Sequence, residues 1–249
     1  IKQRNNKTLY ALKINNDPED TSGAKLLESA AKLASATDNK LIQIMKCDLN
    51  ISNCIIDTVQ ANKITDLIVG IHHKANIVDT FLGGTITALI NGTSHQNLII
   101  YGPKRPINSV KRLVVTVPQM AELEIGFDLW FDRVKNIASQ LSIPIVFYAN
   151  KTTTEALKKQ CEIHSSLNVS FRELASWEDF LIISKDIKHS DTLIVITARK
   201  ATVSYNNLFE KIPYYLNKYF ADNNFLLIYP QQTAPDGTDN DIYNPLKIS

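Results

Sequence analysis

Glycines and histidines cluster where a buried strand is expected to give way to a helix. The segment "TDLIVGIHHKANIVDTFLGGTITALI" (65–90) contains Gly70, His72, His73, Gly83 and Gly84. At such a crossing, backbone N–H groups and the dipole of the next helix favour a bound anion. The predicted chemistry is therefore non-covalent, the holding of a phosphate or similar group. The competing interpretation is tight turns, for which glycine is suited.

No motif for covalent chemistry accompanies this segment. The sequence has no Gly-x-Ser-x-Gly elbow, no Walker lysine motif and no Cys-x-x-Cys pair. Adjacent histidines such as His72 and His73 do not normally share a ligand face, and no Cys, Asp or Glu cluster joins them. We therefore expect no catalytic residues, no metal site and no required cofactor.

Composition narrows the class of partner. The 249 residues include 27 basic and 25 acidic ones, so the net charge is only +2. This balance disfavours nucleic acid and anionic membrane surfaces as partners. The three cysteines lack metal-ligand spacing and are odd in number, which is typical of reduced thiols in a cytosolic setting. The chain begins with Ile1 rather than Met, and we expect it to be part of a longer protein.

Strand and helix patterns alternate along the chain. Short apolar runs occur at 8–14, 40–45, 66–70, 97–101, 112–117, 145–149, 168–174, 192–197 and 225–229. Helical patterns lie at 21–36, 52–64, 82–91, 122–142, 154–164, 176–187 and 207–220. This alternation, with strands that are apolar almost throughout, predicts an α/β fold with a parallel sheet covered on both faces.

An internal repeat divides the chain. The run "LIVG" at 67–70 matches "LIVI" at 193–196, and "LIIY" at 98–101 matches "LLIY" at 226–229. The repeat predicts two tandem doubly wound domains. The first half is 1–101, the second half is 112–230, and 231–249 form an irregular C-terminal tail.

The first half is shorter than the second by about one strand–helix unit. In a doubly wound sheet of order 3-2-1-4-5 the first strand is central, and its loss leaves backbone groups unpaired. We expect either that preceding residues supply this strand or that the first half is rearranged, with a swapped segment in its place. The strands "NLIIY" and "FLLIY" would otherwise be exposed apolar edges, so we also expect them to pair and to join the halves.

The spacing Gly70-x2-His73-x9-Gly83-Gly84 resembles the nucleotide loop of the universal stress protein family, and the resemblance covers nearly the whole chain as two copies. The family carries Gly-x2-Gly-x9-Gly-Ser/Thr there, and in ATP-binding members the loop wraps the ribose and phosphates. The resemblance implies that an adenine nucleotide (ATP, ADP or AMP) or a similar anion binds in the first half. The site residues that it implies are Gly70, His72, His73, Lys74, Gly83, Gly84 and Thr85.

The second half departs from this pattern. Ile196, Arg199, Phe209 and Glu210 stand at its four motif positions. Pro118 stands where the family has an aspartate that helps to hold the nucleotide. We expect the second half not to bind nucleotide.

A narrower resemblance concerns "TDLIVGIHHKANIVDTFLGG", "PINSVKRLVVTVP" and "IVFYAN". These segments are similar to the cytoplasmic C-terminal region of bacterial monovalent cation/proton antiporters. The resemblance implies a regulatory region on the cytoplasmic face of the inner membrane, whose partner is the transport domain of the same polypeptide. A free-standing tandem universal stress protein that binds adenine nucleotide in the cytosol is the alternative, and a homodimer is a further expectation. An enzyme acting on adenine nucleotides ranks last.

Overall fold

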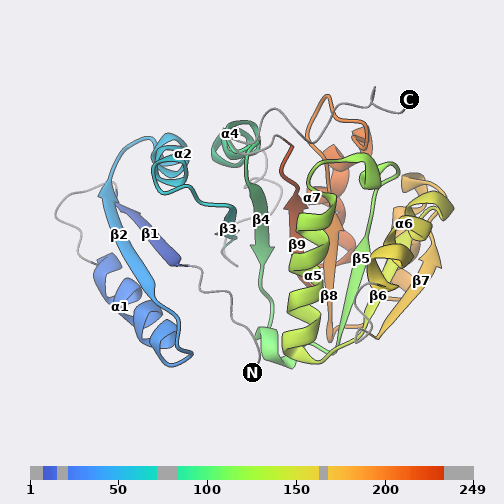
Figure 1. The fold of residues 1–249 in the computed structure, drawn as a ribbon, viewed down its shortest axis with the longest axis horizontal. Helices are drawn as coiled ribbons and strands as arrows, with labels where there is room; N and C mark the ends of the chain where they lie inside the picture. Colours follow the sequence, from blue (N-terminus) through green and yellow to red (C-terminus); the bar gives the residue numbers. More distant parts are fainter. Residues whose placement is uncertain (1–7, 16–21, 72–83, 163–167, 233–249) are drawn as a thin grey trace, which may run out of the picture. The chain divides into compact units, whose positions relative to one another are not determined.

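The structure is a computed structural model that describes residues 8–15, 22–71, 84–162 and 168–232 (Figure 1). The chain divides into two compact units, Ile1–Lys63 and Ile64–Ser249. Across the described ranges, every helix is too short or too polar to cross a membrane.

The first unit contains a two-stranded parallel sheet. Its elements are β1 (Leu9–Asn15), α1 (Ser22–Ser35), β2 (Leu41–Cys47) and α2 (Ile51–Ala61). Leu9 lies opposite Leu41, and the ladder ends with Asn15 opposite Cys47. The Asn50 side chain caps α2 by accepting a hydrogen bond from Asn53 N at 3.1 Å.

The second unit is built on a seven-stranded sheet of order β3-β4-β9-β8-β5-β6-β7. Its strands are β3 (Asp66–Gly70), β4 (Asn97–Gly102), β5 (Arg112–Thr116), β6 (Ile145–Ala149), β7 (Val169–Glu173), β8 (Asp191–Ile196) and β9 (Asn224–Tyr229). Its α-helices are α4 (Gly84–Gly92), α5 (Phe127–Leu141), α6 (Lys151–Glu162) and α7 (Ile212–Tyr219). The described part of this unit also contains the 3₁₀ helices η1 (Ile107–Ser109), η2 (Ala121–Leu123), η3 (Trp177–Lys185) and η4 (Asn207–Lys211). The predicted α/β fold with a mainly parallel sheet is confirmed.

The two halves of the repeat meet at an antiparallel strand pair. Leu98 of β4 lies opposite Tyr229 of β9, and the pairing runs to Gly102 opposite Phe225. All other strand pairs in the sheet are parallel. The predicted pairing of "NLIIY" with "FLLIY" is therefore confirmed.

The strand registers refine the repeat. Ile68 of β3 lies opposite Ile99 of β4, and its repeat equivalent Ile194 of β8 lies opposite Leu226 of β9. The structural equivalent of Ile99 is thus Leu226, an offset of 127, whereas the matching letters gave 128. Side chains alternate between the two faces of a strand. Aligning β4 with β9 at an offset of 128, as the sequence identity suggested, would therefore pair residues that lie on opposite faces of the sheet.

The strands of the first half lie in two separate sheets. β1 and β2 form one, while β3 and β4 belong to the seven-stranded sheet. Among the described residues, β3 pairs only with β4. The described strands of the first half thus form no continuous five-stranded sheet, and the supply of a central strand by preceding residues stays a prediction. The domain division into 1–101, 112–230 and the tail 231–249 stays a prediction. The two compact units divide after Lys63 instead, and β4 pairs with β9 within the second unit.

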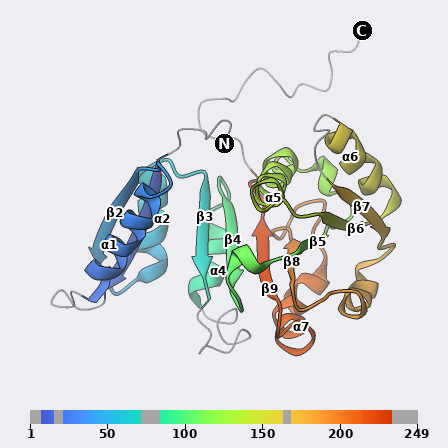
Figure 2. The same ribbon diagram turned by 90° about the horizontal axis from the view of Figure 1, so that it is seen from below.

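Helices cover both faces of the seven-stranded sheet. Seen from below, α5 and α6 lie on one face and α4 and α7 on the other (Figure 2). α5 has a buried apolar stripe consisting of Phe127, Trp130, Phe131, Val134 and Ala138. This stripe forms one core with inward side chains of β4, β5, β6, β8 and β9.

Candidate functional site

The first-half crossing runs from the end of β3 to the start of α4. Gly70 ends β3, and the next residue, Ile71, extends the ladder by donating from its N–H to Tyr101 O at 2.9 Å. Gly84 begins α4, and Gly70, Gly84 and Thr85 are exposed. The other predicted site residues, His72, His73, Lys74 and Gly83, lie outside the described residues.

The turn interpretation does not account for Gly70 or Gly84. A Cβ atom added to either would meet no heavy atom of the described residues within 4 Å, and neither has a left-handed φ. Neither the packing nor the backbone therefore requires glycine at these positions. Open space above the main chain lets a ligand approach the N–H groups of the helix start.

The second-half crossing, from β8 to α7, is filled by its own side chains. Ile196 is fully buried, and Arg199 and Phe209 are nearly so. The Phe209 ring meets Trp177 edge to face, with centroids 4.8 Å apart. The fourth motif residue, Glu210, is exposed and pairs with Lys200 at 2.9 Å.

The guanidinium of Arg199 donates hydrogen bonds to several main-chain carbonyl groups at this crossing. Its Nε donates to Ile90 O at 2.8 Å, and its Nη2 donates to Thr93 O at 2.7 Å, both near the C-terminal end of α4. Its Nη1 donates to Pro230 O, beyond β9. Burial lowers the pKa of Arg199 to about 10, which leaves the guanidinium charged at neutral pH. Arg199, at the second of the four motif positions, thus binds the helix of the other half.

A carboxylate occupies part of the same crossing. Glu124, in the turn after β5, accepts hydrogen bonds from Ser204 N at 3.0 Å and from Ser204 Oγ at 2.7 Å. A main-chain N–H and a hydroxyl at the carboxyl end of parallel strands are the donors that a phosphate would use. These contacts favour the interpretation that the second half does not bind nucleotide.

A second polar contact joins the two halves. Asp66, at the start of β3, receives hydrogen bonds from Arg133 of α5 at 2.7 Å and 2.9 Å. Asn97 Nδ2 also donates to Asp66, at 3.1 Å, and Asn97 Oδ1 accepts from Gln231 N. Burial alone would raise the pKa of Asp66, but hydrogen bonds from Arg133, Thr65 and Asn97 outweigh it and hold the pKa below its usual value.

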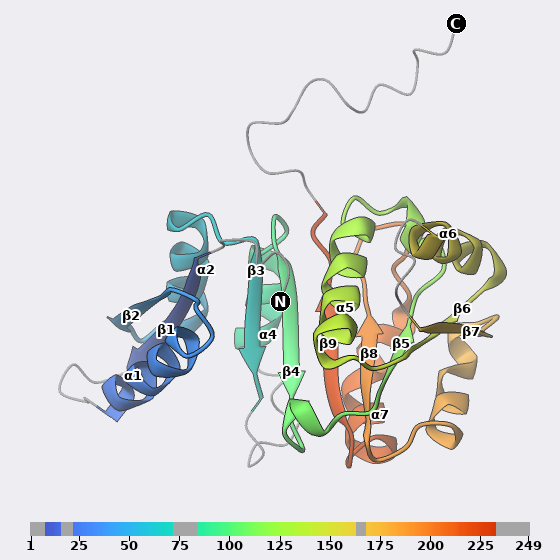
Figure 3. The same cartoon turned by 60° about the horizontal axis from the view of Figure 1, so that its bottom comes forward.

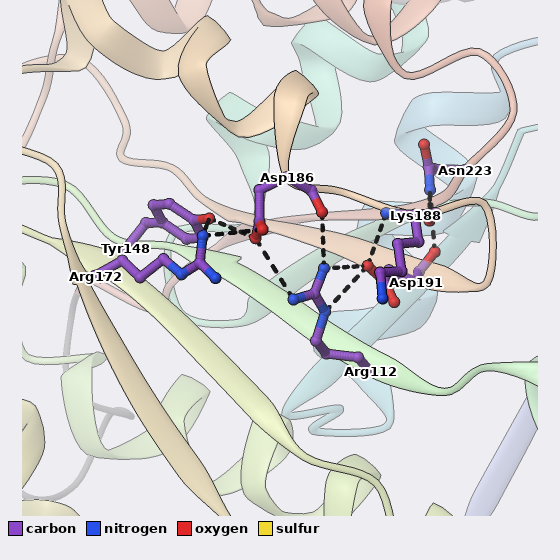
Figure 4. A network of polar contacts seen from close by, with 7 residues as sticks. All are labelled: Arg112, Tyr148, Arg172, Asp186, Lys188, Asp191 and Asn223. Atoms are coloured by element: carbon purple, nitrogen blue, oxygen red, sulfur yellow. Dashed lines mark hydrogen bonds and ion pairs between the residues drawn. The ribbon is translucent and has the colours of Figure 1, made fainter.

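A larger polar network lies against β5, β6, β7 and β8 (Figure 4). Arg112 pairs with Asp191 at 2.5 Å and with Asp186 at 3.5 Å, while Arg172 pairs with Asp186 at 2.9 Å. Tyr148 Oη donates to Asp186 at 2.7 Å. Burial, followed by the hydrogen bond to Asp186, raises the pKa of Tyr148 to about 12. The two cations and two anions balance, which fits a structural role better than a reactive one.

Sequence reasoning found the first-half crossing but not the roles of Arg199, Glu124 or Asp66. Each of them acts on residues far away in the chain, and no local spacing signals such a contact. Within the described ranges, no group of three or more His, Cys, Asp or Glu side chains could hold a metal ion.

Solved structures with a similar α/β fold are known. A protein assigned as a universal stress protein from Pseudomonas aeruginosa UCBPP-PA14 has a TM-score of 0.58 at 12% identity, covering 91% of this chain and 84% of that chain. A universal stress protein from Archaeoglobus fulgidus DSM 4304 has a TM-score of 0.52 at 13% identity, covering 84% and 77%. A protein of unknown function from Pseudomonas aeruginosa PAO1 has a TM-score of 0.57 at 12% identity, covering 91% and 83%.

These similarities establish the α/β fold of universal stress proteins. No family model and no curated protein matches the sequence.

Proposed function

We propose that the chain is a tandem binding module of the universal stress protein type, which takes an adenine nucleotide or a similar anion in its first half only. The observation that carries the proposal is the difference between the two crossings. At the first, Gly70 and Gly84 are exposed, and a Cβ at either would meet no atom of the described residues. At the second, Arg199, Phe209 and the Glu124–Ser204 contact fill the equivalent region.

The chemistry follows from the ends of the crossing. The start of α4 presents main-chain N–H groups that have no partner within the helix, together with the positive end of the helix dipole, and Thr85 adds a hydroxyl. These groups suit a phosphate, and Lys74 would add a charge-assisted contact. Binding would bias what the end of β3 and the start of α4 contact. The module is therefore proposed to regulate rather than to catalyse, with no required cofactor.

The Gly84→Asp variant tests this proposal. The carboxylate would stand where a phosphate is expected and repel it, while an acidic residue at a helix start favours folding. Because a Cβ at Gly84 meets no described atom within 4 Å, the variant is expected to fold normally. We expect calorimetric titration of ATP, ADP and AMP to give heat of binding with the original protein and none with the variant.

The matched control is Gly84→Ser, which adds a Cβ and a hydroxyl without charge. It should keep the binding and the melting temperature. Equal binding by the Gly84→Asp variant, or no heat with the original protein at millimolar nucleotide, would contradict the proposal and leave the glycines without a ligand role.

A second candidate is the regulatory region of a cation/proton antiporter on the cytoplasmic face of the inner membrane. The sequence resemblance at "TDLIVGIHHKANIVDTFLGG" favours it. The partner would then be a transport domain in the same polypeptide, and a homodimer of such proteins would bring two modules together. Following the reading frame upstream tests this candidate, since apolar stretches long enough to span a membrane are expected there.

A further inference from the structure

An apolar cavity of about 580 Å³ lies on the α5 face of the seven-stranded sheet, where the two halves join. Its lining includes Ile99 and Leu226, which belong to β4 and β9, and Ile137 of α5. The linker after β4 forms another part of it, with Lys104 and Arg105. In Figure 3, α5 lies in front of β8 and β9, while no described helix of this unit lies in front of β3 and β4.

The two halves differ sharply at this face. Ile68 of β3 lines the cavity and is 66% exposed, whereas its repeat equivalent, Ile194 of β8, is fully buried in the core that includes α5. The same strand position is therefore covered in one half and open in the other. The volume lies in the range of small-molecule pockets, which are mostly apolar with a few placed polar groups.

Two residues that line the cavity each carry a buried polar atom with no hydrogen-bond partner among the described residues. These atoms are Thr192 Oγ1, on a residue that is fully buried, and Arg105 Nε. A buried polar group without a partner is costly and rare in folded proteins. Arg105 Nε can only donate and is charged, and the Thr192 hydroxyl can also donate. Both therefore suit an acceptor, and the charge favours an anionic one.

The arginine is held in place before any ligand arrives. The buried side chain of Asn224 accepts hydrogen bonds from Lys104 N at 2.6 Å and from Arg105 N at 2.9 Å. It also donates to Arg105 O at 3.1 Å. Arg105 Nη2 donates to Asp222 O at 2.9 Å, which leaves Nε available. A fixed main chain and a fixed guanidinium reduce the ordering cost of binding.

We propose that this cavity binds a small amphipathic carboxylate, with its apolar body on Ile68, Ile99 and Leu226 and its acid group towards Arg105 and Thr192. An arginine and a carboxylate form strong charge-assisted hydrogen bonds, and burial of the ligand's apolar part against the apolar lining lowers the free energy of binding. The cavity does not include the first-half crossing, so this site is independent of the proposed nucleotide binding.

A matched pair of probes tests the proposal. Decanoate and decanol share their apolar chain and differ in charge, and both can be titrated into the intact chain by calorimetry below their aggregation concentrations. We expect decanoate to bind at least about tenfold more tightly than decanol, as expected for one charge-assisted contact. Arg105→Gln should remove most of this preference.

Two further variants separate the polar and apolar parts. Thr192→Val should weaken decanoate binding about threefold to tenfold, yet leave the unliganded protein as stable or more so, because the hydroxyl that it removes has no partner. Ile68→Glu should abolish decanoate binding by placing a like charge in the cavity. Its control is Ile182→Glu on η3, a similarly exposed isoleucine outside the cavity, which should bind as the original protein does.

Three outcomes would overturn the proposal. Equal binding of decanol and decanoate would show that Arg105 does not recognise an acid group, and binding unaffected by Ile68→Glu would place the probe elsewhere. A synthetic peptide with the sequence of α5 that binds when decanoate does not would assign the cavity to a protein helix. Loss of nucleotide binding in Gly84→Asp with decanoate binding intact would keep the two sites distinct and leave this one supported.

Discussion

Replacing Arg199 with methionine is expected to destabilise the seven-stranded unit by roughly 3 kcal/mol. The methionine retains the apolar stem but leaves buried carbonyl groups of Ile90, Thr93 and Pro230 without their donor. Each unpaired buried carbonyl carries a desolvation cost, and they lie on both halves of the repeat. The measurement is the free energy of unfolding in urea, followed by circular dichroism.

The neighbouring residue provides the control. Lys200 is exposed and pairs only at the surface with Glu210, so Lys200→Met should leave the unfolding midpoint nearly unchanged. An Arg199→Met variant that unfolds at the same urea concentration as Lys200→Met would show that water replaces the guanidinium without loss. Arg199 would then not be a structural link between the halves.

Replacing Asp66 with asparagine is expected to lower stability at neutral pH by about 1–2 kcal/mol, allowing for partial exposure of its pair with Arg133 to water. The pKa of Asp66 is lower in the folded protein than its ordinary value of 3.8. Its contribution is therefore fully present above pH 3.8 and is lost as the pH falls through the folded pKa. The difference between the original protein and the variant should accordingly disappear in acid.

Urea unfolding at pH 7 and at several acidic values measures this difference. Asp132→Asn is the matched control, since Asp132 lies on α5 beside Arg133 but pairs with Lys135, and its side chain is 46% exposed against 22% for Asp66. The control should show little change at any pH. A constant difference between Asp66→Asn and the original protein down to the most acidic point would mean that the carboxylate charge does not support the contact.

Much of the fold could be predicted from the sequence because strands and helices carry local signals. The apolar runs of β4 and β9 predicted their pairing, and the stripe of α5 predicted a core helix. Boundaries were less accurate. The helix predicted at 122–142 begins at Phe127, after the 3₁₀ turn of η2. The one predicted at 176–187 is the 3₁₀ helix η3, since its apolar pattern does not distinguish the two helix types.

The site was predictable only in part. Gly70, Gly84 and Thr85 stand at a strand-to-helix crossing as the spacing indicated. Arg199, in contrast, was noted only as a lost glycine, although its guanidinium reaches a helix more than one hundred residues earlier in the chain. A contact of that kind depends on the sheet order and on a particular rotamer. Neither leaves a local pattern in the sequence.

The antiparallel pair of β4 and β9 also has a consequence for the synthesis of this protein. Asn97–Gly102 leaves the ribosome long before Asn224–Tyr229, the strand that covers its second edge. At ordinary elongation rates the delay is on the order of ten seconds. Throughout it, an apolar strand offers free backbone groups to other nascent chains, a hazard for aggregation. We therefore expect a chaperone that covers β4 during synthesis, until β9 can pair with it, to reduce aggregation of this protein.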